Sequence, residues 1–283
     1  MARTEAEALA AELWKADWCR FGVGGSTQGN QALAMAVGRP GQKVIISRTL
    51  HRSMLLGLVL AGLVPVWINP PVDPEFGLPQ GIDPTDVRRA LSEHHDVCAV
   101  FIGDPAYVGT FGDIAAIADA AHEHDVPLIV DAAWAAYLGF HPDLPPHALA
   151  AGADALVTSA HKSLPAINQA AIVLARGERI DLTRLTRCFE AQHTTSPSGQ
   201  ILVSIDASRE LLARHGQRLI GEVIATVATA RERIAQVPGV RVLQGPGVDP
   251  MKFLVMLPGT GAVGYDVEAD LIAKGIRVEM SDQ

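Results

Sequence analysis

The sequence lacks the cysteine and histidine patterns of a disulfide framework or a metal centre. Its cysteines are few, odd in number and far apart: Cys19, Cys98 and Cys188. Such a set indicates reduced, mostly buried thiols in a reducing compartment. The histidines show no zinc-type spacing with acidic or thiol partners, so we expect no metal site. A GxSxG motif and a catalytic-cysteine signature are also absent, which argues against enzymes built on them.

Positive charge is in the minority, and no apolar run is long enough to cross a membrane. The sequence has 23 Lys and Arg against 31 Asp and Glu, a formal charge of −8, with no basic stripe for phosphate contacts. The longest apolar run, residues 54–68, is interrupted by Gly57, Gly62 and Pro65. The first residues form a charged amphipathic stretch without the apolar core of a signal peptide. We therefore expect a cytoplasmic globular protein with neither nucleic-acid nor membrane partners.

Up to residue 175, short β-branched runs alternate with alanine-rich stretches. The clearest strand candidates are residues 43–47, 64–68, 97–103, 126–132, 153–159 and 170–175. Between them lie helical patterns such as residues 113–124, whose apolar side chains fall on one face. Strands without polar alternation, separated by helices, predict an α/β fold with a mostly parallel central sheet that is covered on both faces. Sites in such sheets lie beyond the carboxyl ends of the strands.

After Pro197 the pattern changes to a long helix and then to short strands. Residues 201–235 have helical apolar spacing, and residues 240–243 and 253–257 are strand candidates on either side of a loop rich in Gly and Pro. This order indicates the start of a smaller α/β domain. We predict a large domain over residues 1–235, with its long connecting helix, and a partial small C-terminal domain over residues 236–283.

The segment GGSTQGN, residues 24–30, precedes a helical stretch and has the composition of a phosphate cradle. Glycines let backbone N–H groups approach an anion, the Ser26 and Thr27 hydroxyls can donate, and a helix N-terminus adds partial positive charge. The spacing is neither GxGxxG nor that of a Walker A loop. Taken alone, an ordinary glycine loop with a Ser or Thr helix cap explains the segment at least as well.

Asp131 ends the apolar run LIVD. A carboxylate at the end of a buried strand is costly unless a cationic partner compensates for its lost hydration. The protonated pyridine nitrogen of pyridoxal 5′-phosphate (PLP) is such a partner, and keeping it protonated makes PLP an electron sink. The alternative is that Asp131 simply caps the next helix.

Lys162 directly follows the strand candidate 153–159, so we expect it at the same edge of the sheet as Asp131. Ser159 and His161 flank it and can add donors for a phosphate. His51 follows the strand candidate 43–47, where its ring can stack on an aromatic cofactor. A single lysine is usually a solvated charge, and a single histidine is usually structural. The ordered combination of glycine loop, strand-end Asp and strand-end Lys is what indicates an amine that forms an imine with PLP.

Together these segments resemble the Orn/Lys/Arg decarboxylase family of fold-type I PLP enzymes. The matching stretches, in the family's order, are GGSTQGN, RTLHRS, DPAYVGTFGD, PLIVDAAW, FHPDLP, GADALVTSAHKSLPAINQAA and HTTSPSGQILVSIDASR. The most specific of them is SAHKSLPA after GADALVT. The resemblance implies the PLP-dependent transferase-like large domain of fold type I. Family members usually have a further N-terminal segment and a longer C-terminal domain, so we expect this chain to be a shortened member.

The resemblance also implies a role for each matching residue. Lys162 would hold PLP as a Schiff base, Asp131 would pair with the pyridine nitrogen, and His51 would stack on the ring. Four side chains would hold the phosphate: Ser26, Thr27, Ser159 and His161. Trp134 is implied near the 3-hydroxyl side of the cofactor.

A polar segment around Thr195 resembles one that reaches the site of a neighbouring subunit, which implies a homodimer or a higher homo-oligomer. Turn and helix-cap chemistry explains this hydroxyl-rich segment at least as well.

The implied activity is decarboxylation of arginine, lysine or ornithine to the corresponding amine, a reaction of polyamine metabolism. Two alternatives stay open at this point. One is another fold-type I reaction, such as aminotransfer or an aldol-type cleavage, because the chemistry depends on which bond at Cα is aligned with the ring. The other is a shortened, non-catalytic paralogue that binds a full-length partner.

Overall fold

The computed structural model describes residues 2–282, which divide into two compact units. The N-terminal unit ends at Ile220, and the C-terminal unit begins at Gly221. This division falls inside the helix α8 (Gly199–Ile234). The domain boundary expected after residue 235 follows the end of this helix, and it stays a prediction.

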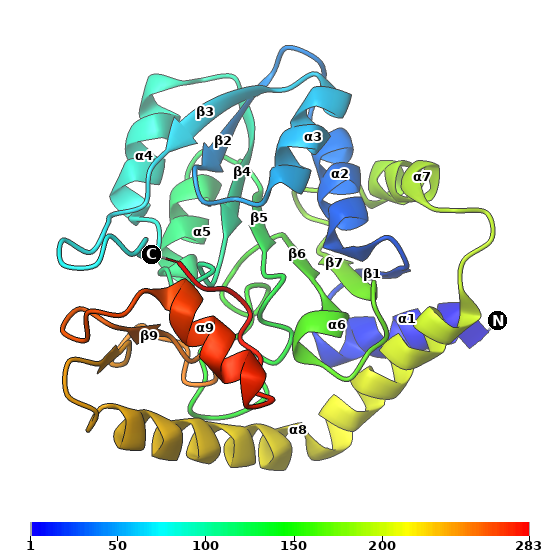
Figure 1. Ribbon diagram of the computed structural model, residues 1–283. Helices are drawn as coiled ribbons and strands as arrows, with labels where there is room; N and C mark the ends of the chain where they lie inside the picture. The colour runs from blue at the N-terminus through cyan, green and yellow to red at the C-terminus, as the bar shows by residue number, and fades with distance from the viewer. Residues whose placement is uncertain (1, 283) are drawn as a thin grey trace. The chain divides into compact units, whose positions relative to one another are not determined.

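A seven-stranded sheet forms the centre of the N-terminal unit (Figure 1). Its strands are β1 (Trp18–Gly22), β2 (Lys43–Ser47), β3 (Val64–Ile68), β4 (Val97–Gly103), β5 (Leu128–Asp131), β6 (Ala155–Thr158) and β7 (Ala171–Ala175). Their order across the sheet is β1-β7-β6-β5-β4-β2-β3. β7 runs antiparallel to both of its neighbours, and the remaining pairings are parallel. The sheet is therefore mostly parallel, as predicted.

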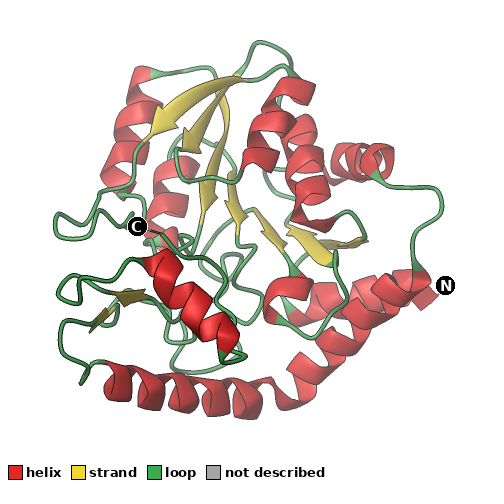
Figure 2. Cartoon of the chain, in the orientation of Figure 1, coloured by secondary structure: helices red, strands yellow, loops and turns green. Residues whose placement is uncertain are grey.

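Helices cover both faces of this sheet (Figures 1 and 2). The helices of this unit are α1 (Ala2–Leu13), α2 (Gly25–Val37), α3 (Arg52–Ala61), α4 (Pro84–Glu93), α5 (Ile114–His122), α6 (Ala160–Ser163), α7 (Leu182–Gln192) and the first part of α8. α2, α3 and α7 lie on one face, and α4 and α5 lie on the other (Figure 1). Successive β4 residues, from Ala99 to Ile102, are all buried because each face of the strand meets a layer of helices.

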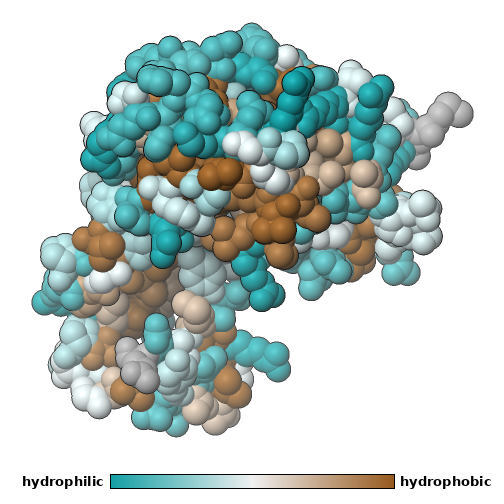
Figure 3. Space-filling model, turned by 90° about the horizontal axis from the view of Figure 1, so that it is seen from above, coloured by the Kyte–Doolittle hydropathy of each residue, from teal (hydrophilic) through white to brown (hydrophobic). Residues whose placement is uncertain are grey.

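One surface of α3 remains exposed. Its exposed apolar side chains are Leu55, Leu56, Val59 and Leu60, and the edge strand β3 adds Val64 and Trp67. Figure 3 looks down on the end of the unit at which these two elements lie in Figure 1, and apolar side chains gather on that face. Contiguous exposed apolar surface of this kind is uncommon on monomeric proteins.

The C-terminal unit contains the end of α8, the strands β8 (Arg241–Val242) and β9 (Val255–Met256), and the helix α9 (Gly264–Ala273). The two strands pair antiparallel. The Arg231 guanidinium of α8 donates to the backbone carbonyls of Asp249, at 2.8 Å, and of Lys252. These bonds fix the loop between β8 and β9 against the helix.

The three cysteines are free thiols, of which Cys19 is buried and the other two are half-buried. Burial raises the pKa of Cys98 to about 11, so this thiol is protonated at neutral pH. None of the helices that the structure describes is long and apolar enough to cross a membrane.

Candidate active site

Several of the predicted site residues meet at the carboxyl edge of the sheet. Asp131 is the last residue of β5, and Ser159 directly follows β6, which is its parallel neighbour. Ser26 belongs to the first turn of α2, and its Oγ lies 2.6 Å from the Oγ of Ser159. The structure thus brings residues 133 positions apart into one cluster.

The Asp131 carboxylate is buried and held from both sides. Its Oδ2 accepts a hydrogen bond of 2.7 Å from Nδ2 of Asn30, and its Oδ1 accepts one of 3.2 Å from the backbone N–H of Ala133. Burial raises the pKa of this carboxyl group, and it is the strongest influence. The bond from Asn30 lowers the pKa of Asp131, as do, to a smaller extent, the His51 ring in its protonated form and the Lys162 ammonium. The carboxylate therefore lies within electrostatic reach of two other predicted site residues.

The hydroxyls of Ser26 and Ser159 form a buried polar pair beside the N-terminus of α2. Gly25, at the start of this helix, has a φ of +69°, a conformation that glycine adopts without strain. Four residues later, Gly29 lets α2 pack closely on the sheet, since a Cβ there would lie 2.6 Å from Cγ2 of Val173. Close packing brings the helix N-terminus to the ends of β6 and β7, and such an N-terminus favours an anion.

His51 is exposed and caps the N-terminus of α3. Its Nδ1 accepts a hydrogen bond of 3.2 Å from the backbone N–H of Ser53 and lies 2.9 Å from the Ser53 hydroxyl. Because a backbone N–H can only donate, the ring carries its hydrogen on Nε2. One ring edge is thus engaged, and the ring has a defined orientation at the helix end.

Lys162 is exposed on the one-turn helix α6. Its Nζ lies 4.3 Å from the centre of the Trp134 ring, within cation–π distance. Trp134 in turn packs edge-on against Tyr107, with 5.6 Å between ring centres. The two rings flank the lysine side of the cluster.

Three predicted cofactor residues are placed differently. Thr27 is exposed on the first turn of α2. Nδ1 of His161 donates to the backbone carbonyl of Ala170 at 2.7 Å, so only its other ring nitrogen is left for an anion. Thr195 is exposed on the loop after α7 and lines a separate hollow of about 350 Å³. None of the other predicted site residues lines that hollow.

The sequence analysis did not identify two residues that connect the cluster, Asn30 and Ser53. Nδ2 of Asn30, the residue that bonds Asp131, also donates to the Oγ of Ser53 at 3.1 Å. Asn30 is the last residue of the segment GGSTQGN, and it lies four positions after Ser26 in α2. Because residues four apart share a helix face, this spacing was the available signal.

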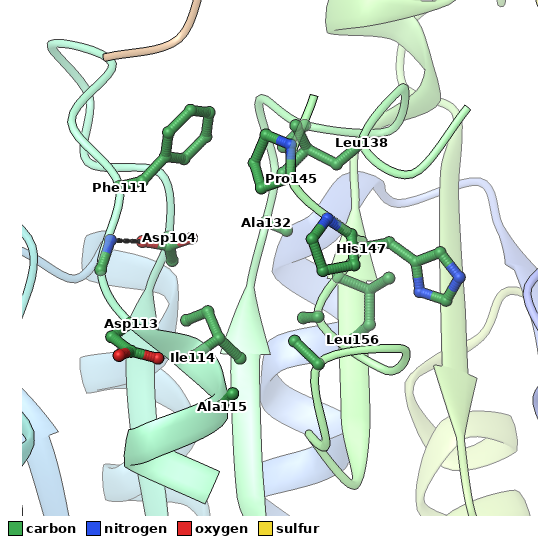
Figure 4. A pocket seen from close by; sticks show the side chains of 15 residues that line it. Asp104, Phe111, Asp113, Ile114, Ala115, Ala132, Leu138, Pro145, His147 and Leu156 are labelled. Carbon is green, nitrogen blue, oxygen red and sulfur yellow. Dashed lines mark hydrogen bonds between the residues drawn. The ribbon is translucent and has the colours of Figure 1, made fainter. Parts of the chain in front are cut away.

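A mostly apolar cavity of about 270 Å³ lies on the α5 side of the sheet (Figure 4). Figure 4 shows Phe111 and Ile114 on one side of it and Pro145 and His147 on the other. Ala132, next to Asp131, lines this cavity, but none of the predicted site residues does. The hollow is therefore distinct from the candidate site.

Across residues 2–282, no group of three or more His, Cys, Asp or Glu side chains is arranged to hold a metal ion. The polar groups of the candidate site are instead hydroxyls, one buried carboxylate, one buried amide and one lysine. Such a set offers hydroxyl donors for an anion and one buried carboxylate as the acceptor for a cationic nitrogen.

Comparison with known proteins gives one family over almost the whole chain. The family model of the Orn/Lys/Arg decarboxylase major domain matches residues 2–273. An arginine decarboxylase of Bacillus subtilis (strain 168) is 34% identical over 98% of this chain, and the chain spans 59% of that relative. The constitutive lysine decarboxylase of Escherichia coli (strain K12) is 26% identical over 94% of this chain, which spans 40% of that relative.

Solved structures give the same fold. The E. coli constitutive lysine decarboxylase superposes with a TM-score of 0.83 at 22% identity, over 98% of this chain and 47% of the other. The ureidoglycine-glyoxylate aminotransferase of B. subtilis superposes with a TM-score of 0.80 at 18% identity, over 99% of this chain and 76% of the other. At these identities the likeness shows the fold alone, and it confirms the predicted fold-type I architecture.

Proposed function

The chain belongs to the Orn/Lys/Arg decarboxylase family, and we propose that it carries the major domain of a PLP-dependent enzyme that decarboxylates a basic amino acid. The family predicted from the sequence is thus confirmed, and curated relatives are named arginine or lysine decarboxylases. The chain spans 59% of the length of the B. subtilis arginine decarboxylase. Activity, substrate and assembly of the whole protein are therefore part of the proposal.

The buried carboxylate of Asp131 is the observation that carries the proposal. It sits at the carboxyl edge of the sheet, between parallel strands, and the Lys162 ammonium lies close enough to act on it. A buried carboxylate is costly without a cationic partner, and a protonated pyridine nitrogen supplies one. The hydroxyl pair of Ser26 and Ser159, at a helix N-terminus, suits the phosphate of the same molecule. The residues present therefore fit PLP.

When bound, PLP supplies an electron sink for the pair of electrons that the departing carboxylate leaves on Cα. In this proposal Lys162 would hold the cofactor covalently through its amine. Asp131 would keep the proton on the pyridine nitrogen. His51 would pack against the ring, and either its Nε2–H or the Lys162 amine would return a proton to Cα. Thr27, His161 and Trp134 would complete the cofactor contacts.

The decisive experiment locates the covalent bond. Purified protein incubated with PLP is reduced with borohydride, digested and analysed by mass spectrometry. We expect the modified peptide to carry PLP on Lys162, and we expect the absorption band of the covalently held cofactor to be missing in Lys162→Ala. A band that persists in this variant without added amine, or a label on another lysine, contradicts the assignment.

Substrate and reaction type are tested together. Arginine, lysine and ornithine are supplied separately while CO₂ and 2-oxo acids are each measured. We expect CO₂ and the corresponding amine from at least one of the three. Formation of a 2-oxo acid without CO₂ would instead favour aminotransfer, a reaction named for one structural neighbour. If the purified protein retains no PLP and binds a longer relative, it would instead be a non-catalytic paralogue.

We further propose a cytoplasmic homodimer in which Thr195 serves the site of the neighbouring subunit. Thr195 lies apart from the other site residues in one chain, which fits a contribution to a second site. The test mixes Lys162→Ala and Thr195→Ala chains, each weakly active alone. A mixed dimer has one site with an intact Lys162 and an intact Thr195 from the other chain, so we expect activity to return. No recovery in verified mixed dimers contradicts the shared site.

A further inference from the structure

One amide side chain links the two groups that would flank the cofactor ring. Asn30 is completely buried on α2, and its Nδ2 carries two hydrogens. One hydrogen is donated to Oδ2 of Asp131 at 2.7 Å, and the other to the Oγ of Ser53 at 3.1 Å. A single side chain thus bonds residues on two other segments, the end of β5 and the first turn of α3.

The orientation of this amide follows from its partners. Nδ2 and not Oδ1 of Asn30 faces Asp131, where an N–H donor matches the ionised carboxylate, which can only accept. As a consequence, Oδ1 of Asn30 is buried with no hydrogen-bond partner among the described residues. Leaving a buried carbonyl without a partner is unfavourable for folding. In this orientation Oδ1 of Asn30 accepts no hydrogen bond, while Nδ2 donates to both Asp131 and Ser53.

The second arm of the link ends on His51. The backbone N–H of Ser53 donates to Nδ1 of His51, so this nitrogen is an acceptor. The Ser53 hydroxyl accepts from Asn30, and its own hydrogen is left for Nδ1 of His51, which lies 2.9 Å away. Donation therefore runs in one direction, from Asn30 to Ser53 and on to His51. Ser53 is itself buried, so water does not compete for the hydrogen bond between Asn30 and Ser53.

We propose that Asn30 is a positioning residue that orients the Asp131 carboxylate, favours its ionised form and, through Ser53, fixes the neutral His51 ring with its hydrogen on Nε2. This inference rests on the proposed function only for its purpose, because the network is made by residues of this chain alone. Burial raises the pKa of Asp131, and the Asn30 bond is the first of the influences that lower it, ahead of the Lys162 ammonium. Asn30 thus works against the effect of burial.

The first test follows the Asp131 carboxyl in the full chain prepared without cofactor. Carboxyl ¹³C resonances are recorded as a function of pH, and Asp131→Asn assigns the signal. In Asn30→Ala we expect the ratio of ionised to protonated carboxyl at a fixed pH to fall about tenfold or more, the effect of losing a hydrogen bond to a charged group. The control Gln28→Ala removes a buried amide from the same helix without a bond to Asp131. An unchanged titration in folded Asn30→Ala overturns the proposal.

A second variant keeps the test decisive if Asn30→Ala does not fold. Asn30→Asp has nearly the same shape and places a second carboxyl group 2.7 Å from Oδ2 of Asp131, if the observed contact persists. Two such carboxyls share one proton, so one of them should titrate far above the other. Independent titration of the two groups would show that position 30 does not contact Asp131, and the proposal would fail.

The third test reads the His51 ring. In the wild-type protein, ¹⁵N spectra should show Nδ1 without hydrogen and Nε2 with it. We expect Ser53→Ala and Asn30→Ala each to raise the share of the opposite tautomer, while Gln28→Ala leaves it unchanged. Only Asn30→Ala should also alter the Asp131 titration. If the His51 tautomer ratio is the same in wild type, Ser53→Ala and Asn30→Ala, the proposed link from Asn30 through Ser53 to His51 is wrong. Because no measurement here needs cofactor, failure of the network and failure of the PLP assignment are separate outcomes.

Discussion

The ammonium of Lys162 lies 4.3 Å from the centre of the Trp134 ring. A cation at this distance from an indole face is attracted by its π electrons, by about 0.5–1 kcal/mol at an exposed position. Lys162 is exposed and Trp134 half-buried, so the lower range applies. This attraction favours the side-chain conformations of Lys162 in which its ammonium lies over the Trp134 ring.

A double-mutant cycle measures this contact. We expect Trp134→Ala and Lys162→Met to be coupled by about 0.5–1 kcal/mol in the free energy of unfolding by urea, without cofactor. Trp134→Phe keeps an aromatic ring and should retain part of this coupling. Strictly additive effects of the two substitutions would show that the pair contributes nothing in solution.

Residues 43–47 and 97–103 coincide with β2 and β4, because continuous apolar runs in a parallel sheet need cover on each side. Residues 64–68 coincide with β3, an edge strand whose Val64 and Trp67 are exposed, so its β-branched and aromatic side chains were the signal. β1 (Trp18–Gly22) was missed, since its short sequence WCRFG carries Arg20 among its apolar residues. The direction of β7 was not predicted either. The connection from β6 holds only the one-turn helix α6, whereas parallel neighbours usually need a longer crossover.

The site was predictable as a set of segments but not as a network. Asp131 and Ser159 could be placed because the carboxyl ends of parallel strands meet at one edge. The link from Asn30 joins residues 101 and 23 positions away, and no sequence pattern states where a side chain turns. Thr195 was grouped with the cofactor residues through the family resemblance, and within one chain it lies elsewhere.

If the Ser26 and Ser159 hydroxyls hold the phosphate, the site should prefer PLP over pyridoxal because of them. Ser26→Ala removes one of the two neighbouring hydroxyls at the N-terminus of α2. We expect it to weaken PLP binding about tenfold or more, the effect of one hydrogen bond to a charged group. Pyridoxal, which has no phosphate, should bind equally well to variant and wild type. Both affinities can be measured by fluorescence titration.

Ser47→Ala is the matched control, since it removes a buried hydroxyl that bonds Thr49 and not Ser159. It should leave the ratio of PLP to pyridoxal affinity unchanged. An equal loss of both ligands in Ser26→Ala would mean that this hydroxyl supports the fold and does not contact the phosphate.

The close approach of α2 to the sheet makes Gly29 sensitive to any side chain. A Cβ there would lie 2.6 Å from Val173 and 2.9 Å from Val157, so the helix must move away. We expect Gly29→Ala to lower the free energy of unfolding by about 1–3 kcal/mol, the usual cost of overpacking. PLP affinity should fall as well, because Ser26 moves with the helix.

Gly199→Ala provides the comparison. Gly199 begins α8, and a Cβ there meets no heavy atom within 4 Å, so stability should change by less than about 0.5 kcal/mol. If Gly29→Ala is as stable as Gly199→Ala, the close packing of α2 does not exist in solution.

His147 predicts how stability depends on pH. Burial lowers the pKa of this imidazole from 6.5 to about 4, and the positive charges of Arg176 and Lys15 act in the same direction. Above about pH 6.5 the ring is neutral in both the folded and the unfolded chain, so its contribution is constant. Between about pH 6.5 and 4 the unfolded chain binds a proton that the folded chain does not. The free energy of unfolding should therefore fall as the pH falls through this window.

His147→Asn removes the titrating ring while leaving a side-chain acceptor for the backbone N–H of Ala150, which now bonds Nδ1 of His147 at 3.2 Å. Compared with wild type, this variant should lose less stability between about pH 7 and about pH 5, as measured by urea unfolding. His95→Asn, at an exposed histidine, should follow the wild-type dependence. If His147→Asn and wild type lose equal stability over this range, then His147 is hydrated in the folded protein, and the pocket of Figure 4 admits water to its ring.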